Sequence, residues 1–325
     1  MRVISSYSGR IKCFNSKYLS SGGHGLVFKI PTKETEDEMV NQEEYKNNSL
    51  ALKVNRWSGS DENLKREYAI LQKIFNRAVP KSQLPIVKPI SFLQIKPRSY
   101  LVMKAYTGSV DDYISVNKRF NIKLTKKAGK EILTALKFLH ESKDGVIIHG
   151  DIKPGNIFYD GSEPKPSFNQ IFNCSNEFET IHHDSDEEMP DFVLGDFGNS
   201  IPLKKGVSSL HTNGEVTSLS YRAPELLPAE GREFYVVTPS IDIWSLGCTL
   251  YELYTGKVLF KANNEDKLNS LIMSFERKGI SSKMLEADIK DPDKELCELI
   301  SQMLCINPKE RPSAAQLLER PFFDN

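Results

Sequence analysis

The sequence predicts an α+β protein built of two lobes, a small β-rich lobe over residues 1–106 and a larger, mainly helical lobe over residues 107–325. Short apolar stretches bounded by Gly, Pro or Ser fill the first hundred residues, a pattern typical of β-strands. From about Asp112 onward, apolar residues recur at helical spacing instead. No repeat of about 20–50 residues is present, which excludes solenoids and propellers.

The first lobe is expected to hold a small sheet and one helix. The helix is predicted over residues 62–75, where Leu64, Leu71 and Phe75 share one face. Strands are predicted at residues 18–19, 26–30, 50–54 and 100–103.

The second lobe is expected to contain both amphipathic and fully buried helices. Residues 125–141 place Ile132, Leu136 and Leu139 on one face, which predicts a helix packed on a core. Residues 241–254 are apolar on most sides, which predicts a helix buried all round.

Two polar segments interrupt these elements and are predicted to be surface insertions. Residues 32–49 and 160–192 lack the periodicity that would bury a face. His182 and His183 lie beside acidic residues in the second segment, but no third ligand is spaced for zinc, so we expect a solvated loop there.

The chain of 325 residues carries 43 basic and 43 acidic side chains, so its formal charge is zero. Such a balance argues against a general nucleic-acid binder. However, residues 32–49 hold two basic and six acidic side chains, and residues 160–192 hold one and nine. The rest of the chain therefore carries twelve more positive than negative charges.

Localisation is predicted from the absence of targeting and disulfide patterns. No apolar run is long enough to span a bilayer, and the N-terminus has no apolar segment typical of a secretion signal. The five cysteines are scattered without a C-x-x-C pair, which argues against structural zinc and a disulfide framework. We expect an intracellular protein of the cytoplasm or nucleus without a membrane partner.

A glycine-rich stretch at residues 20–27 lies between two predicted strands and includes Gly22 and Gly25. Glycines allow backbone N–H groups to approach phosphate oxygens closely, although a plain β-turn has the same composition. The segment is no Walker A loop, because no G-K-[ST] follows and a strand comes next.

Three further motifs carry charged side chains in apolar surroundings. Lys53 stands inside an apolar strand and needs an anion if it is buried, for which Glu67 on the next helix is a candidate. The loop 149–156 (HGDIKPGN) places Asp151, Lys153 and Asn156 between two apolar segments. The third motif is D-F-G at residues 196–198, which follows an apolar strand.

With A-P-E at residues 223–225, these motifs occur in the order Gly-rich loop, A-x-K, H-x-D-x-K-x-x-N, D-F-G and A-P-E. That order is the signature set of protein kinases. The chain therefore resembles a eukaryotic serine/threonine protein kinase over about residues 18–323. The resemblance implies the bilobal protein kinase fold, ATP and Mg²⁺ as cofactors, and protein substrates.

The resemblance also implies roles for the charged residues. Lys53, fixed by Glu67, would hold the α- and β-phosphates of ATP. Asp151 would orient the substrate hydroxyl and accept its proton, while Lys153 neutralises the γ-phosphate.

The binding residues follow by the same resemblance. Asn156 and Asp196 would bind Mg²⁺, a hard cation that prefers oxygen ligands. Positions matching the phosphate loop, adenine site, gatekeeper and hinge are Gly22, Gly25, Leu19, Val27, Ala51, Phe158, Met103 and Tyr106.

Specificity is predicted from two further matches. The D-x-K-P pattern at Asp151 and the position of Ser218 are typical of kinases that phosphorylate Ser and Thr. Arg222, directly before A-P-E, is similar to the CMGC group of cyclin-dependent and MAP kinases, in which it favours proline after the phosphoacceptor.

Departures from the kinase pattern predict unusual regulation. Gly150 replaces the arginine that holds an activating phosphate, and Asn213 stands near the usual activating threonine, so we expect activity without activation-loop phosphorylation. Gly23 and His24 replace an inhibitory Thr-Tyr pair, and helix 62–75 lacks a cyclin-binding sequence. We therefore expect a monomeric catalytic domain without a cyclin partner.

Two alternatives remain beside an active protein kinase. Because Gly150 and Ser20 replace a usual arginine and glycine, the chain could be a pseudokinase or scaffold that binds nucleotide without efficient turnover. A small-molecule kinase of the same fold is disfavoured, since it predicts no A-P-E segment.

Overall fold

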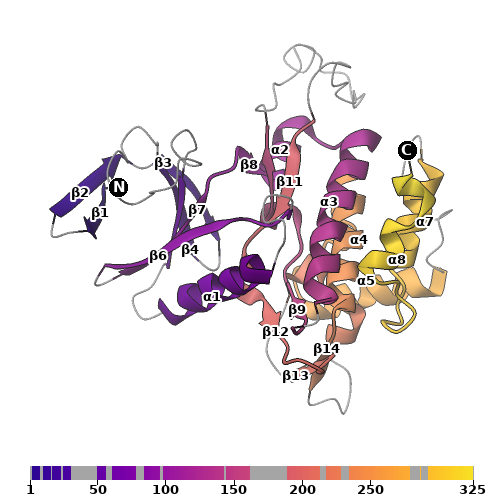
Figure 1. Cartoon of the computed structure of the whole chain (residues 1–325). Coiled ribbons are helices and arrows are strands. Elements are labelled where there is room, and N and C mark those ends of the chain that lie inside the picture. The colour runs from indigo at the N-terminus through magenta and orange to yellow at the C-terminus, as the bar shows by residue number, and fades with distance from the viewer. Residues whose placement is uncertain are drawn as a thin grey trace, which may run out of the picture. The chain divides into compact units, whose positions relative to one another are not determined.

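The computed structural model of the chain describes residues 2–7, 10–15, 17–22, 25–30, 50–55, 61–77, 84–95, 98–142, 144–161, 189–212, 217–227, 234–278, 286 and 292–324. Figure 1 shows the chain, which divides into two compact units. Residues 1–106 with Asp196–Gly198 form the N-terminal unit, and residues 107–195 with 199–325 form the C-terminal unit. The division after Tyr106 coincides with the lobe boundary that we place from the sequence.

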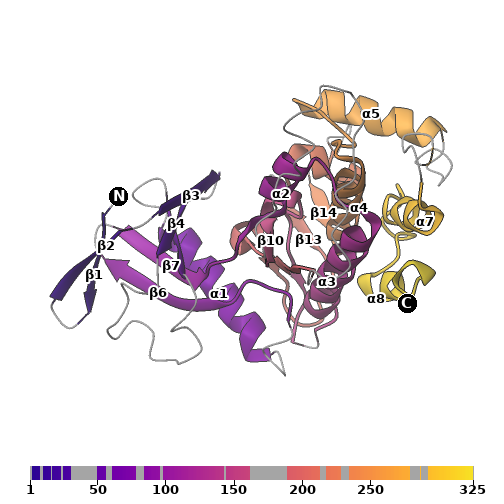
Figure 2. The same ribbon diagram turned by 90° about the horizontal axis from the view of Figure 1, so that it is seen from above.

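The N-terminal unit contains a five-stranded antiparallel sheet of order β3-β4-β5-β7-β6. Its strands are β3 (Lys17–Gly22), β4 (Gly25–Ile30), β5 (Leu50–Val54), β6 (Pro89–Ile95) and β7 (Arg98–Lys104). A separate antiparallel pair precedes it, β1 (Arg2–Tyr7) with β2 (Arg10–Asn15) (Figure 2).

The sequence does not predict β1, β2 or β6. Strand β6 begins at Pro89 and lies at the edge of the sheet, where its side chains are half-buried or exposed. An edge strand tolerates proline, but proline in a sequence is usually a turn signal, so Pro89 conceals a strand that contains Ile90, Phe92 and Leu93.

Helix α1 (Asp61–Arg77) covers the predicted helix with one residue more at its start and two at its end. Acidic residues occupy its first turn and Arg77 its last, an arrangement that complements the helix dipole. The helix buries Leu64, Ile70, Leu71, Ile74 and Phe75. A core of Phe28, Leu50, Leu52, Val54, Tyr100 and Val102 lies on the sheet.

The C-terminal unit is mainly helical, which with the β-rich N-terminal unit confirms the α+β class. Its helices are α2 (Val110–Asn117), α3 (Ile122–His140), α4 (Ser240–Thr255), α5 (Glu265–Lys278), α7 (Lys294–Met303) and α8 (Ala314–Leu318). None of the helices in the described residues is long and apolar enough to cross a membrane.

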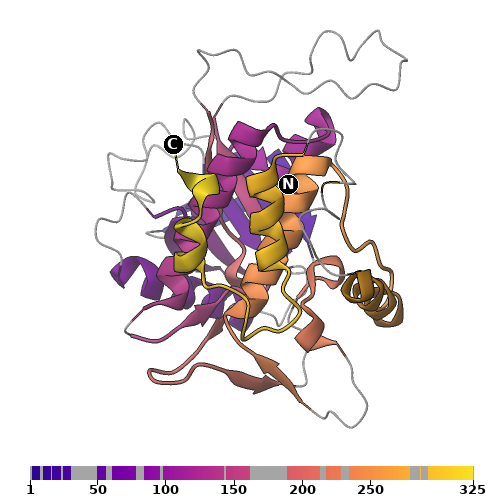
Figure 3. The same ribbon diagram turned by 90° about the vertical axis from the view of Figure 1, so that its right-hand side faces the viewer.

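Helix α4 is buried along nearly its whole length, as its sequence predicts. It packs against α3 and α7, and Figure 3 shows the three helices side by side. Gly247 makes the contact with α7 close, because a Cβ there would come 3.0 Å from Cβ of Met303.

Short strands and turns occupy the part of this unit that carries the predicted catalytic motifs. The strands are β8 (Gly108–Ser109), β9 (Ile147–Ile148), β10 (Ile157–Asp160), β11 (Asp191–Leu194), β12 (Ile201–Pro202), β13 (Leu210–Thr212) and β14 (Tyr235–Val237). The pairs are β8 and β11 with β10, β9 with β12, and β13 with β14.

The predicted bounds of the second insertion, 160–192, are wrong at both ends. Asp160 and Asp191 face each other in the antiparallel pair of β10 and β11, and Phe192 is completely buried. Each of the two strands has only four residues and borders the polar segment, so the sequence pattern does not reveal where the strands end. Residues 32–49, His182 and His183 lie outside the described residues.

Candidate active site

Lys53 lies on β5, a strand inside the sheet of the N-terminal unit, and its ammonium group is buried. It donates to both carboxylate oxygens of Glu67 on α1, at 2.9 Å to Oε1 and 2.8 Å to Oε2. A third bond of 2.7 Å reaches Oδ1 of Asp196. An ammonium group has three protons, so these bonds account for all of them.

The charges of this cluster stabilise one another. Burial works to lower the pKa of Lys53, but the carboxylates of Asp196 and Glu67 outweigh it and hold the pKa above its ordinary value. Lys53 therefore stays charged, as a phosphate-binding cation must.

Asp196 adopts a left-handed backbone conformation, with φ at 57°. This conformation is uncommon outside glycine, and strained residues cluster at functional sites. The carboxylate of this residue pairs with Lys53 at 2.7 Å.

The strand register brings the predicted adenine-site residues to one face of the sheet. Val27 pairs with Lys53, and Ala51 pairs with Met103. Directly paired residues, and residues two apart on one strand, point to the same face. Val27, Ala51, Met103 and Lys53 therefore share one face.

The remaining nucleotide-site predictions divide between the units. Gly22 and Gly25 are paired at the end of the β3–β4 hairpin, and Leu19 lies on β3. Tyr106 follows β7, with the ammonium group of Lys104 5.2 Å from its ring centre. Phe158 lies on β10 of the C-terminal unit, paired with Ser109 and Val193.

The C-terminal unit joins Asp151, Lys153 and Ser218 in a hydrogen-bonded triangle. Lys153 Nζ donates to Oδ2 of Asp151 at 2.8 Å and to Oγ of Ser218 at 2.7 Å. Ser218 Oγ donates to Oδ1 of Asp151 at 2.7 Å. Asn156 Nδ2 donates to Oδ2 of Asp151 at 2.9 Å, so three side chains orient one carboxylate.

Asp151 is 3 % exposed, and its pKa reflects two opposing effects. Burial raises the pKa, but Lys153 and the hydroxyl of Ser218 outweigh burial and bring it below the ordinary value. Asp151 is therefore ionised at neutral pH and can accept a hydrogen bond from a hydroxyl substrate.

The backbone of this loop is held by Asp242, a buried residue in the first turn of α4. Its carboxylate accepts the N–H groups of His149 and Gly150, both at 2.8 Å. Gly150 has a φ of 80°, where glycine relieves the strain that another residue would carry. No role for Asp242 is predicted from the sequence, although an acidic residue in an apolar helix is itself a signal for one.

Two arginines hold the segment around A-P-E. Arg311 donates to both oxygens of Glu225, at 2.9 and 3.1 Å. Arg222 donates to the carbonyl oxygen of Thr217 at 2.9 Å and pairs with Glu265 of α5. Bidentate contacts of this kind fix orientation as well as charge.

Comparison with known proteins relates the chain to one family. Residues 15–323 match the family described as Protein kinase domain. The chain belongs to the protein kinase family.

Several protein kinases are similar to this chain in sequence. A probable serine/threonine-protein kinase nek2 from Dictyostelium discoideum is 29 % identical over 94 % of this chain, which spans 61 % of that relative's length. Cell division control protein 2 homolog 3 from Trypanosoma brucei brucei is 27 % identical, covering 94 % of this chain and 90 % of the relative. Probable cyclin-dependent kinase 8 from Dictyostelium discoideum is 24 % identical, with 94 % and 79 % covered. The chain is a protein serine/threonine kinase of the α+β protein kinase fold, as the sequence predicts.

The side chains predicted to bind Mg²⁺ have suitable chemistry. Asn156 uses its Nδ2 to donate to the carbonyl and carboxylate of Asp151, which leaves its amide oxygen for a cation. Asp196 adds a carboxylate. Mg²⁺ is usually bound by one or two such oxygens together with substrate phosphates, so the residues fit the ion. No group of three or more metal-ligating residues occurs within the described part of the chain.

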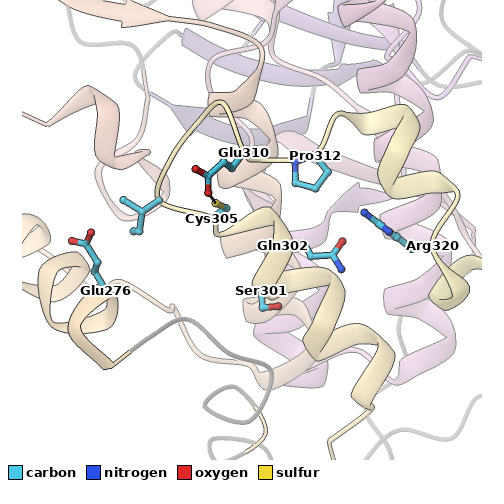
Figure 4. Close-up of a pocket in the computed structure, with 8 residues that line it drawn as sticks. Glu276, Ser301, Gln302, Cys305, Glu310, Pro312 and Arg320 are labelled. Carbon is cyan, nitrogen blue, oxygen red and sulfur yellow. Dashed lines mark hydrogen bonds between the residues drawn. The ribbon is translucent and has the colours of Figure 1, made fainter.

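The C-terminal unit also contains a cavity of about 510 Å³ that is lined by other residues. Figure 4 shows its lining, which includes Glu276 of α5, Gln302 of α7, Cys305 and Arg320. None of the predicted site residues lines it.

Proposed function

We propose that the kinase transfers the γ-phosphate of Mg-ATP to serine and threonine side chains of protein substrates. The observation that carries this proposal is the triangle of Asp151, Lys153 and Ser218, with each distance between 2.7 and 2.8 Å. It presents an ionised carboxylate for an acceptor hydroxyl beside a cation for the transferred phosphate.

The other residues bind and orient the reactants. Lys53 would exchange one of its carboxylate bonds for phosphate oxygens, while Glu67 keeps it in place. Asn156 and Asp196 would hold Mg²⁺, which neutralises phosphate charge when bound. Val27, Ala51 and Met103 offer an apolar face for adenine.

Phosphotransfer from Mg-ATP to a generic protein substrate tests the proposal. We expect Lys53→Met, Asp151→Asn and Asp196→Asn each to lower kcat/KM by about a hundredfold or more, since catalysis here consists of positioning and charge neutralisation. Lys127→Met is the control, because this lysine pairs with Asp191 and Glu131, outside the predicted site residues. Nucleotide binding without phosphotransfer in the wild type would favour the pseudokinase alternative, and turnover that persists in the three variants would overturn the site.

We also propose that the kinase prefers proline after the phosphoacceptor. The support is the bond from Arg222 to the carbonyl oxygen of Thr217, one residue before Ser218. A carbonyl that already accepts from Arg222 is a weaker acceptor for the backbone N–H of a substrate residue, and proline has no N–H to leave unpaired.

Peptide pairs that differ by proline or alanine after the acceptor test this preference. We expect the proline peptide to have about a tenfold higher kcat/KM, the cost of one unpaired N–H group. Arg222→Met should reduce the preference. Equal rates on both peptides would remove the proline-directed assignment and leave the kinase activity standing.

We further propose that the kinase is active as a monomer, without a cyclin-type partner or activation-loop phosphorylation. The Lys53–Glu67 pair is present in the single chain, and the large apolar side chains of α1 are buried or half-buried. Gly150 offers no cation for an activating phosphate, and Thr217 is 6 % exposed.

Phosphatase-treated protein, shown by mass spectrometry to be unphosphorylated and by light scattering to be monomeric, should keep its kcat. A loss of most activity on this treatment would contradict the proposal. We propose an intracellular location, which imaging of a tagged chain tests.

A further inference from the structure

Strands β13 and β14 connect two segments that are distant along the chain. Strand β13 belongs to residues 199–225, which we call the activation segment, and β14 directly precedes α4. Their antiparallel register pairs Leu210 with Val237, His211 with Val236 and Thr212 with Tyr235. Figure 1 shows the two strands side by side.

The β14 side of this pair is firmly held. Val237 is completely buried, and β14 also contacts the turn η8 (Pro224–Leu226) that carries Glu225. Ser240 lies three residues after the end of β14. Its carbonyl oxygen accepts a 2.7 Å hydrogen bond from Arg311, which also binds Glu225. The pair therefore ties the activation segment to the start of the best-buried helix of the unit.

The start of α4 also holds the catalytic loop. Asp242 binds the N–H groups of His149 and Gly150, immediately before Asp151. The activation segment contacts Asp151 through Ser218, whose N–H donates to Oδ1 at 3.1 Å. While β13 stays paired with β14, the activation segment and the loop that carries Asp151 are both attached to the start of α4. This attachment keeps Ser218 close to Asp151.

The position directly before Asp151 offers no cation to a phosphate. Gly150 carries no side chain where the kinase pattern has an arginine. Thr212 is itself part of the paired strand, and Thr217 is buried.

We propose that the β13–β14 pair anchors the activation segment in its active conformation, in place of a contact between a phosphate and an arginine. This inference rests on the proposed kinase activity and adds the element that replaces phosphorylation. Main-chain pairing needs no modification, so the anchor is present as soon as the chain folds.

Proline substitutions on the paired strands test the anchor. His211 and Val236 are exposed and directly opposed, so His211→Pro and Val236→Pro disturb the pairing without removing a buried side chain. We expect at least one of them to lower kcat by about tenfold, at an unchanged unfolding temperature. The control is Ser208→Pro, an exposed position of the same segment outside the pair, which should leave kcat unchanged.

A cross-link provides an independent measurement. Directly opposed residues have Cβ atoms about 4.5–5.5 Å apart, within about 1 Å of the spacing in a disulfide, so the double variant His211→Cys with Val236→Cys should form a disulfide on oxidation. We expect the oxidised form, verified by mass spectrometry, to keep wild-type kcat and to resist proteolysis of residues 204–212. An inactive cross-linked form would overturn the proposal, because pairing would then not be the active state.

The outcomes separate this inference from the proposed function. An unphosphorylated wild type without phosphotransfer would refute the kinase activity itself. An active wild type whose two proline variants are equally active would refute the anchor alone. If the wild type needs a phosphorylated activation segment for activity, the proposal that strand pairing replaces phosphorylation is likewise refuted.

Discussion

Ser218 is the residue through which the activation segment meets the catalytic aspartate. It donates to Asp151 and accepts from Lys153, each at 2.7 Å. A hydroxyl group can do both at once, which an alanine or a carboxylate in its place cannot.

We predict that Ser218→Ala lowers kcat about tenfold, since hydrogen bonds to charged groups are worth ~1.5–3 kcal/mol. The hydroxyl helps to depress the pKa of Asp151, so its removal raises that pKa and moves the acidic limb of the kcat/KM profile to higher pH. By the same sign, the stability that the ionised Asp151 contributes is present above its ordinary pKa and is lost as pH falls. Ser218→Thr should restore both properties, and Ser220→Ala should leave them unchanged. A profile that does not move would contradict the assigned contact.

We expect Glu131 on α3 to make the stability of the folded protein depend on pH. Burial raises its pKa to about 7, although its carboxylate accepts the N–H of Phe192 at 2.7 Å. The folded protein therefore holds a proton that the unfolded chain releases near its ordinary pKa, and stability falls as pH rises toward 7. We expect Glu131→Gln, which can still accept this bond, to lose less stability over that range in urea titrations. Parallel curves for the two proteins would show that Glu131 does not titrate in this way.

At the scale of elements, three glycines separate the effects of backbone strain and steric contact. Gly256 ends α4 with φ at 71°, and a Cβ there would lie 2.6 Å from the carbonyl oxygen of Lys118. Gly206 has φ at 79° with open space around it, and Gly155 has open space without a positive φ.

Alanine at these positions should destabilise the protein in the order Gly256, Gly206, Gly155. We expect about 1 kcal/mol for the strained but open Gly206, more for Gly256 and almost nothing for Gly155. Unfolding free energies from denaturant titration measure all three. Equal costs at Gly256 and Gly206 would show that the contact with Lys118 relaxes freely.

The hairpin of β10 and β11 predicts which deletion of the acidic segment is tolerated. Gly161 and Pro190 lie together at the end of the hairpin, because a Cβ on Gly161 would be 2.9 Å from Cβ of Pro190. Replacing residues 162–188 by Asn-Gly should therefore leave the unfolding temperature nearly unchanged. Deleting residues 160–192 removes the buried Phe192 and should cost about 3–5 kcal/mol or abolish folding. Similar stability of the two deletions would contradict this division.

At the scale of the whole molecule, thiol labelling distinguishes local from global opening. Cys305 is half-buried at the cavity, whereas Cys248 on α4 and Cys297 on α7 are buried. Burial raises the pKa of Cys297 to about 11 and that of Cys248 above its ordinary value. We expect both to react at least about a hundredfold more slowly than Cys305, because they need unfolding of the core. Rapid labelling of Cys297 in native protein, followed by peptide mapping, would show that α7 opens locally.

Much of the local structure could be predicted from the sequence. Apolar periodicity predicts α1, and a run that is apolar on most sides predicts α4, since both patterns lie within one continuous segment. A lysine in an apolar strand needs an anion, and Glu67 is indeed its partner. The strands β1, β2 and β6 and the ends of β10 and β11 are not predicted, because polar residues or a proline interrupt their apolar patterns.

The sequence by itself determined the family, the order of the catalytic motifs and the chemistry that they carry, since these depend on residue type and spacing. The tertiary structure alone decided that Asp242 holds the catalytic loop, that Arg222 occupies the carbonyl of Thr217 and that β13 pairs with β14. These contacts involve backbone N–H or C=O groups, which nearly every residue carries. The backbone partners of these contacts therefore follow from the packing and register of the folded chain, and the sequence pattern does not identify them.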